Sequence, residues 1–430
     1  MITDHTAAEA VQHAVATLAQ GGMVVVVDDA DRENEGDLVL AAETITAEQM
    51  AFLVRHTTGI VCVPMSAERA DDLRLPPMVS DNTDAHETAF TVSVDLVGTG
   101  TGVSASARTA TAQALADPAL RPDQLRRPGH VFPLRARTGG VLVRGGHTEA
   151  TVDLLTIAGL SGVGVISELV ADDGSMRTGD DLLSFAAAHD LPVLRIADLV
   201  RHRRATERLV VPIASSTMPT EFGCFRAVAY RNRLDATEHL ALVMGDVAEV
   251  GRSDAGVLVR VHSECLTGDI LGSLRCDCGT QLEQALQAVA TAGCGAVVYL
   301  RGHEGRGIGL GHKIRAYALQ EEGMDTVDAN LAQGLPVDSR SYGVGAQILT
   351  DLGIRRIRLM TNNPAKYGGL EGHGVELVER VPLPTHPTPH NVRYLRTKQE
   401  RMGHQLCPPT APRIPGPLGV AASRTATDPA

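Results

Sequence analysis

A chain of 430 residues is long enough to form two domains, or three, each with its own buried core. Its net charge of −12 argues against nucleic acid or acidic membranes as general partners, so any phosphorylated substrate must be held by local arginines. There is no Trp and there are only six Phe and six Tyr, so the cores are expected to consist of Val, Leu, Ile and Ala.

The cysteines and the N-terminus indicate where the protein works. Seven cysteines are an odd number, and those outside the cluster at 265–278 are scattered without the spacing of a disulfide framework, so we expect a reducing compartment. The sequence begins without a basic segment followed by an apolar one, and the apolar run 23–27 is far too short to span a bilayer. We therefore expect a cytoplasmic protein without membrane contact.

The first elements in chain order are a helix and a buried strand. Ala, Val and Leu at helical spacing predict a helix over 7–20, and the uniformly apolar run 23–27 predicts a buried strand. The strand leads into an acidic loop over 28–37. Carboxylates crowded at a strand end repel one another unless a cation lies among them, and magnesium with oxygen ligands is such a cation. A solvated acidic turn is the other interpretation that the loop alone allows.

Six segments of the first half resemble the signature of 3,4-dihydroxy-2-butanone 4-phosphate synthases. They follow one another in the family's order between about residues 5 and 204. The resemblance implies that this half converts ribulose 5-phosphate to 3,4-dihydroxy-2-butanone 4-phosphate and formate, with magnesium or manganese as the cofactor. The segments are Arg32–Asp37, Leu75–Val79, Asn82–Asp84, Thr88–Asp95, Arg127–Arg135 and Gly139–Ala150.

The same resemblance implies a set of site residues. Glu33 and His147 would hold the cation, and His130 and Glu168 would do acid-base work. Arg144 stands before two glycines, so its guanidinium and nearby backbone amides suit a phosphate. His147 and Glu168 each follow an apolar run, 141–143 and 163–166, and both runs are predicted to be strands that end beside the acidic loop. The residues expected to contact ribulose 5-phosphate are Arg32, Glu33, Asp37, Arg144, Gly145, Gly146, His147, Thr148 and Glu168.

A domain boundary is predicted near 205–208. The basic cluster at 201–204 before it is interpreted as the solvated end of a helix rather than a nucleic-acid patch, because four basic residues stand in an acidic chain. The elements predicted around the boundary are a helix over 181–189, a strand over 193–196, strands over 208–214 and 222–230, a helix over 281–290 and a strand over 295–300.

Three cysteines, Cys265, Cys276 and Cys278, lie within fourteen positions of the second half. Thiolates select zinc, which takes four tetrahedral ligands, and three protein ligands leave one position open, as in catalytic sites. The alternative is a closed structural site with His262 or His303 as the fourth ligand. The tight Cys-x-Cys spacing favours the open site over a zinc finger or ribbon.

The sequence around these cysteines resembles the zinc signature of GTP cyclohydrolase II. The resemblance covers about residues 206 to 403 and implies that GTP is hydrolysed to 2,5-diamino-6-(5-phosphoribosylamino)pyrimidin-4-one, formate and pyrophosphate. A zinc ion would be held by the three cysteines, and a magnesium ion on the GTP phosphates is also expected. The matching segments are Arg260–Asp269, Arg275–Gly279, Glu304–Gly309, Asp338–Gly343 and Thr361–Lys366.

This second resemblance implies the GTP-binding residues as well. Asp338 matches the proton acceptor, and Arg340 matches the residue that the family treats as a nucleophile. A charged guanidinium has no lone pair to donate, so a clamp on the phosphates is the simpler role for Arg340. The expected GTP contacts are Arg260, Val261, His262, Ser263, Glu264, Gln281, Glu304, Gly305, Arg306, Thr326, Thr361 and Lys366.

The whole chain is therefore expected to be a bifunctional riboflavin-pathway enzyme of the α/β (α+β) class. Two globular domains, 1–205 and 206–405, would each have a mixed sheet flanked by helices, followed by a disordered tail over 406–430, and both resemblances suggest a homodimer. Relatives usually carry Asp before the arginine at Arg108, where this chain has Ala107. That departure keeps open the alternative that the first half is only a scaffold. A structural-zinc nucleotide- or RNA-binding module is a second alternative, which the acidic charge and the few aromatics oppose.

Overall fold

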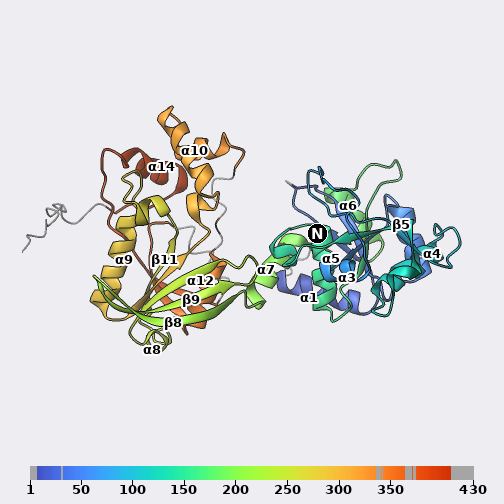
Figure 1. Cartoon of the computed structure of the whole chain (residues 1–430), viewed down its shortest axis with the longest axis horizontal. Helices are drawn as coiled ribbons and strands as arrows, with labels where there is room; N and C mark the ends of the chain where they lie inside the picture. Colours follow the sequence, from blue (N-terminus) through green and yellow to red (C-terminus); the bar gives the residue numbers. More distant parts are fainter. Residues whose placement is uncertain are drawn as a thin grey trace, which may run out of the picture. The chain divides into compact units, whose positions relative to one another are not determined.

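The computed structural model describes residues 7–30, 32–335, 340, 342–363, 370 and 374–407 (Figure 1). The chain divides into two compact units, Met1–Leu209 and Val210–Ala430. Each unit contains a mixed seven-stranded sheet with helices on its faces, which confirms the predicted fold class. Among the described residues, no helix is long and apolar enough to cross a bilayer.

The sheet of the first unit has the strand order β4-β5-β3-β6-β2-β1-β7. The pairs β1–β7 and β3–β5 are parallel, and the other neighbours are antiparallel. The strands are β1 (Val24–Val27), β2 (Gly36–Ala41), β3 (Cys62–Met65), β4 (Val94–Leu96), β5 (Leu125–Arg135), β6 (Gly164–Glu168) and β7 (Val193–Arg195).

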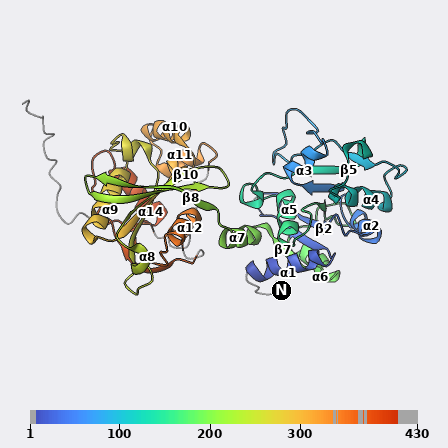
Figure 2. The same ribbon diagram turned by 60° about the horizontal axis from the view of Figure 1, so that its bottom comes forward.

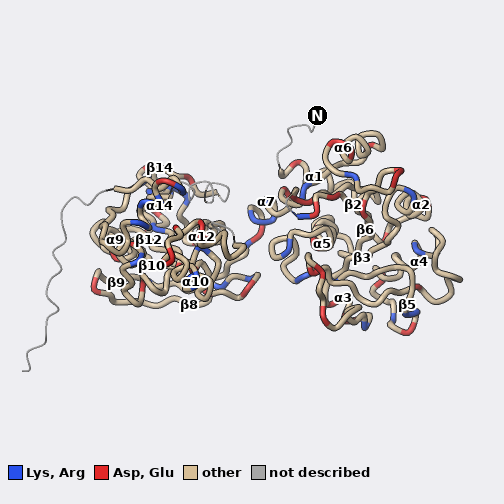
Figure 3. Tube along the Cα trace, turned by 90° about the horizontal axis from the view of Figure 1, so that it is seen from above, with Lys and Arg blue, Asp and Glu red and all other residues tan. Residues whose placement is uncertain are grey.

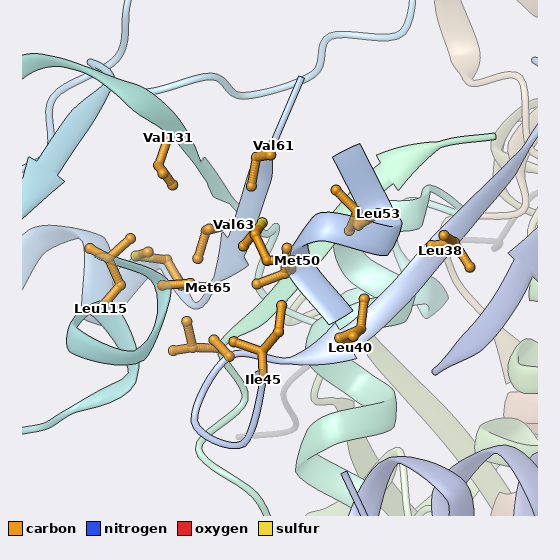
Figure 4. Close-up of a cluster of buried hydrophobic side chains, with 14 of the residues drawn as sticks. Leu38, Leu40, Ile45, Met50, Leu53, Val61, Val63, Met65, Leu115 and Val131 are labelled. Carbon is orange, nitrogen blue, oxygen red and sulfur yellow. The ribbon is translucent and has the colours of Figure 1, made fainter. Parts of the chain in front are cut away.

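Helices cover both faces of this sheet because side chains alternate along its strands. Val24 and Val26 pack against α1 (Ala7–Ala19), α5 (His147–Ile157) and α7 (Ile196–Thr206), and Figure 2 shows these three helices side by side. The opposite face packs against α2 (Ala47–His56), α3 (Ala67–Asp72), α4 (Ala105–Ala116) and α6 (Gly179–Ala188). Figure 4 shows the aliphatic side chains of this second core, among them Ile45, Met50 and Val63, gathered close to one another.

The sheet of the second unit has the order β14-β13-β11-β12-β10-β9-β8. The pairs β14–β13, β13–β11 and β11–β12 are parallel, whereas the pairs β12–β10, β10–β9 and β9–β8 are antiparallel. One face packs on α9 and the other on α12. The strands are β8 (Val210–Thr220), β9 (Gly223–Asn232), β10 (Glu238–Met244), β11 (Val257–Ser263), β12 (Gly295–Leu300), β13 (Arg356–Met360) and β14 (Glu376–Val381). The helices are α8 (Val247–Val250), α9 (Cys278–Ala292), α10 (Leu310–Glu321), α11 (Thr326–Leu331), α12 (Gly343–Asp351) and α14 (Val392–Met402).

Most predicted elements are present. The helix over 7–20 and the strand over 23–27 correspond to α1 and β1, and the elements predicted between 181 and 300 correspond to α6, β7, β8, β9, α9 and β12. The strand predicted over 141–143 is wrong, because Gly140–Leu142 form a single turn of 3-10 helix. Gly139 and Gly140 both have positive φ, of 96° and 61°, so the chain turns where a strand would have to extend. The tail from 408 onward lies outside the described residues.

Candidate functional sites

In the first unit, the acidic loop between β1 and β2 is folded around Asp28. One carboxylate oxygen of Asp28 accepts from the backbone amide of Glu35 at 2.9 Å, and the other accepts from the amide of Glu33 and the guanidinium of Arg32, both at 2.9 Å. The possible ligand atoms of Asp28, Glu33 and His147 all lie within 4.8 Å of one another. The described residues of the loop thus turn around one carboxylate, and the oxygen and nitrogen atoms of Asp28, Glu33 and His147 suit a hard divalent cation.

His147 is the first residue of α5, and it is buried against carboxylates. Its Nδ1 atom lies 3.6 Å from Glu33 Oε2 and 3.9 Å from Asp37 Oδ1. Burial opposes a charge on His147, but Asp37 and Glu33 outweigh it and raise the pKa of His147 to about 9. Burial raises the pKa of Asp37 to about 7, whereas the hydrogen bond from His147 lowers the pKa of Glu33 to about 2. A cation in this place would relieve the repulsion among the carboxylates.

Arg144 is held in a fixed orientation beside this cluster. Its Nη1 donates to Glu149 Oε2 at 2.6 Å, and its Nη2 donates to the carbonyl of His86 at 3.0 Å and to Thr88 Oγ1 at 3.1 Å. A Cβ atom at Gly146 would lie 2.2 Å from Arg144 Nη1, so only glycine leaves the guanidinium in place. Gly145 and Gly146 lead into α5 and Thr148 lies in its first turn, where the helix dipole favours an anion.

Glu168 belongs to this cluster, whereas His130 lies apart from it. Glu168 is opposite Asp37 in the β2–β6 pair, and its Oε2 accepts from Thr58 Oγ1 at 2.6 Å. His130 is on β5, with Nδ1 bonded to Asp95 Oδ2 at 2.8 Å. Strand β3 lies between β5 and β6, so about two strand spacings, or about 10 Å, separate the backbones of His130 and Glu168.

In the second unit, the carboxyl ends of three adjacent parallel strands form the candidate site. Cys265 follows β11, Glu304 follows β12 and Thr361 follows β13. Loops at this edge of an open parallel sheet commonly form ligand sites. Cys276 and Cys278 reach the same edge from the beginning of α9, and the three thiol sulfurs lie within 4.8 Å of one another.

Two glycines make room for the thiols. Residues Leu266–Ile270 form a π-helical turn that packs on the start of α9. A Cβ atom at Gly268 would lie 2.7 Å from Cys276 Sγ, and one at Gly279 would lie 2.3 Å from the carbonyl oxygen of Gly268. Both positions therefore require glycine for this close approach.

The two histidines that could close the site have other partners. His262 Nε2 lies 3.1 Å from both carboxylate oxygens of Asp269, and His303 Nδ1 lies 3.3 Å from Ser263 Oγ. Among the described residues, the possible metal ligands grouped with Cys265 are the other two thiols and no histidine. The donor set fits zinc with three protein ligands.

A buried ion pair supports Cys265. Lys313 Nζ lies 3.1 Å from Cys265 Sγ and 2.5 Å from Glu304 Oε1, and Glu304 Oε2 accepts from the amide of Leu266 at 2.6 Å. Hydrogen bonds from the two other thiols, together with Lys313, hold the pKa of Cys265 well below its usual range. The ammonium of Lys313 therefore favours negative charge at Cys265.

Two adjoining cavities open at the thiols, with volumes of about 100 Å³ and about 70 Å³. They share Ser263, Cys278, Arg340 and Tyr394. Although acidic and basic positions are interspersed along both units (Figure 3), the basic side chains lining the cavities are numerous. The lining cations are Arg275, Arg306, Lys313, Arg340, Arg260 and Lys398.

Most of the predicted GTP contacts line these cavities. Val261 is instead 1% exposed within the core, and Glu304 is paired with Lys313. Asp338 and Lys366 lie outside the described residues. Those lining the first cavity are Ser263, Glu264, Gly305, Arg306 and Thr326, and those lining the second are Arg260, His262, Ser263, Gln281 and Thr361.

Sequence reasoning missed several residues of the two sites. Asp28 and Asp95 stood inside predicted segments without a role of their own, and Asp277 was passed over between two predicted ligands. Lys313 and Lys398 gave no signal, because their partners Cys265 and Asp277 are 48 and 121 positions away in the sequence.

Comparisons with known proteins match each half of the chain to one enzyme family. The profile of the 3,4-dihydroxy-2-butanone 4-phosphate synthase family matches residues 12–202, and that of the GTP cyclohydrolase II family matches residues 212–382. The Riboflavin biosynthesis protein RibBA of Salinispora arenicola is 58% identical over 397 residues, covering 92% of this chain and 94% of that protein.

Solved structures include a two-domain 3,4-dihydroxy-2-butanone 4-phosphate synthase, RibBX from A. baumannii. It is 35% identical, with a TM-score of 0.66, and covers 87% of this chain and 99% of that chain. A 3,4-dihydroxy-2-butanone 4-phosphate synthase in complex with two magnesium ions is 44% identical over 47% of this chain and 98% of that chain, with a TM-score of 0.44. Nothing in these comparisons favours the scaffold or the RNA-binding alternative. The chain belongs to the family of bifunctional riboflavin biosynthesis proteins that join a 3,4-dihydroxy-2-butanone 4-phosphate synthase to a GTP cyclohydrolase II.

Proposed function

We propose that each unit carries out one of the two reactions with its own metal. The first unit would convert ribulose 5-phosphate to 3,4-dihydroxy-2-butanone 4-phosphate and formate, and the second would hydrolyse GTP to the diaminopyrimidinone, formate and pyrophosphate. The observation that carries this proposal is the pair of different donor sets. Oxygen and nitrogen atoms group around Glu33 in the first unit, and three thiols group in the second.

In the first unit, magnesium or manganese would be held by Glu33 and His147, with Asp28 as a further ligand or as the support of the loop. When bound, the cation supplies a Lewis acid for the carbonyl and hydroxyl oxygens of the sugar. Arg144 and the start of α5 would bind the phosphate, and Arg32 and Asp37 would contact the sugar.

Glu168 and His130 would move protons in the first unit. Glu168 is supported in this role by its position opposite Asp37, and His130 by its hydrogen bond to Asp95, which orients the imidazole. Because about two strand spacings separate them, they would act on different positions of the substrate. We also propose a homodimer, which sedimentation or light scattering of the purified chain would test.

In the second unit, zinc would be held by Cys265, Cys276 and Cys278. When bound, zinc supplies a Lewis acid and an acidified water for opening the imidazole ring of guanine. Arg260 and Arg340 would clamp the phosphates, with a magnesium ion on the same phosphates, and Asp338 would accept a proton. The clamp role of Arg340 is supported by its place in both cavities and by the absence of a lone pair on a charged guanidinium.

Formate released from each substrate, together with the zinc content, tests the proposal. Glu33→Gln should abolish formate release from ribulose 5-phosphate and leave release from GTP unchanged. Cys276→Ser should do the reverse and lower zinc below about one ion per chain, because two thiolates hold zinc poorly. Full formate release from GTP by zinc-free protein would refute the assignment of the second unit.

A further inference from the structure

The C-terminal segment of the second unit returns to the thiol cluster. The cyclohydrolase profile ends at residue 382, and the described chain continues to 407 through α14. In the view of Figure 1, α14 lies at the same end of this unit as α10, the helix that carries Lys313. Tyr394 of α14 lines both cavities, and Lys398 lines the second. A segment beyond the matched region thus contributes walls to the site.

Lys398 makes a buried ion pair with the residue between two of the thiols. Its Nζ donates to Asp277 Oδ1 at 2.8 Å, and the two residues are 8% and 4% exposed. Asp277 stands between Cys276 and Cys278 in the sequence, so a force on its carboxylate acts on the turn that sets the distance between these two sulfurs. Desolvating two charges is unfavourable, so such a pair is weak evidence for stability and better evidence for a specific geometry.

The ion pair is one end of a longer hydrogen-bond chain. The second oxygen of Asp277 accepts from Gln281 Nε2 at 2.6 Å, and Gln281 Oε1 accepts from Arg260 Nη2 at 2.6 Å. Arg260 Nη1 in turn donates to the carbonyl of Met360 at 2.9 Å. The chain therefore connects α14, the Cys-x-Cys turn, β11 and β13, whose loops form the site.

Lys398 is not what attaches α14 to the unit. Arg401, one turn further along, pairs with Asp325 and Asp328 beside α11, and Leu395 is buried at 3% exposure. These contacts hold the helix whether or not Lys398 is charged. The ammonium of Lys398, which also lies 4.5 Å from the centre of the Tyr394 ring, has Asp277 as its ion-pair partner.

We infer that Lys398 is a positioning residue for the cyclohydrolase centre, where its ion pair with Asp277 holds the turn of Cys276 and Cys278 in the arrangement that binds zinc. This inference rests on the zinc site proposed for the second unit. It extends that site to α14, beyond the region matched by the family profile.

The test compares zinc retention and kinetics in single variants of the full chain. Lys398→Met should release zinc to a chromophoric chelator about 10- to 100-fold faster than the unchanged protein. Loss of an interaction that orients the ligands of a metal typically has an effect of this size. With zinc in excess, kcat for formate release from GTP should fall while KM for GTP changes little. Lys398→Arg should restore most of the zinc retention. Arg396→Met, which removes an exposed cation from the same helix, is the matched control and should behave as the unchanged protein.

A double variant makes the test independent of a simple folding defect. Asp277→Asn with Lys398→Met leaves no unpaired buried charge, so its zinc release should be no faster than that of either single variant. Effects that multiply in the double variant would overturn the inference, because the two residues would then act separately. An increased KM with unchanged zinc retention in Lys398→Met would also overturn it, because Lys398 would then be a phosphate contact. Failure of the unchanged protein to bind zinc at all would instead reject the proposed function.

Discussion

Adding one methyl group at Gly268 should dismantle the zinc site proposed for the second unit. In the Gly268→Ala variant, the new Cβ would lie 2.7 Å from Cys276 Sγ and 3.1 Å from Cys265 Sγ. Non-bonded heavy atoms keep about 3.5 to 4.0 Å apart, so Cys276 Sγ would have to move by about 1 Å. Zinc sites hold their ligand distances within about 0.2 Å, so this displacement should weaken zinc binding at least about 10- to 100-fold.

The assay is zinc per chain after dialysis against a competing chelator, with formate release from both substrates. We expect Gly268→Ala to lose zinc and GTP turnover and to keep turnover of ribulose 5-phosphate. Gly311→Ala is the matched control, because its Cβ would meet nothing within 4 Å and alanine favours a helix by about 0.5 to 1 kcal/mol. Unchanged zinc retention in Gly268→Ala would refute the reasoning, since the three thiols could not then be the ligands in this arrangement.

Three further predictions concern other parts of the chain. Ala107 is 6% exposed at the start of α4, and the neighbouring Arg108 donates to the carbonyl of Gly59 at 3.3 Å. Ala107→Asp would add one supporting contact beside Arg108. It should therefore raise the catalytic efficiency for ribulose 5-phosphate by about tenfold or less. An inactive parent rescued by that substitution would instead show that the first unit is degenerate. Burial, followed by the nearby charge of Lys398, lowers the pKa of His404 to about 3, whereas an unfolded histidine titrates near about 6.5. The unfolded state therefore takes up a proton first as the pH falls below about 6.5, and the second unit should lose up to about 2 kcal/mol of stability by pH 5. His404→Gln should remove that loss in urea unfolding at pH 7 and pH 5, and an equal loss in both proteins would contradict it. Finally, separate expression of residues 1–209 and 210–430 should give two soluble pieces with one activity each, and insolubility of both would mean that the units depend on each other.

The thiol cluster was the part of the site most open to prediction, because its three ligands lie within fourteen positions and their chemistry is specific. Glu33 and His147 came from a family resemblance, and the structure brings them together although they are far apart in the sequence. The strand predicted over 141–143 is wrong because an apolar run of three residues does not determine whether the backbone is extended or turned. Here the positive φ angles of Gly139 and Gly140 turn the chain.

The supporting residues were beyond sequence reasoning for a physical reason. Lys313 and Lys398 stand on helices, where an isolated lysine reads as a solvated surface residue. Their burial follows from how α10 and α14 pack at the carboxyl ends of the parallel strands, and a local pattern does not contain that information. Val261 and Glu304, in contrast, lie in segments that predicted contacts with GTP. In the structure Val261 is buried in the core, and Glu304 is paired with Lys313.

The chemistry proposed for the second unit depends on zinc held by three thiolates with one open position. X-ray absorption at the zinc edge of the full-length, zinc-loaded protein measures this most directly. We expect three sulfur neighbours at about 2.3 Å and one oxygen at about 2.0 Å that is replaced or displaced when GTP is added. A fourth neighbour with the outer scattering of an imidazole ring, unchanged by GTP, would contradict it and make the site a closed structural one.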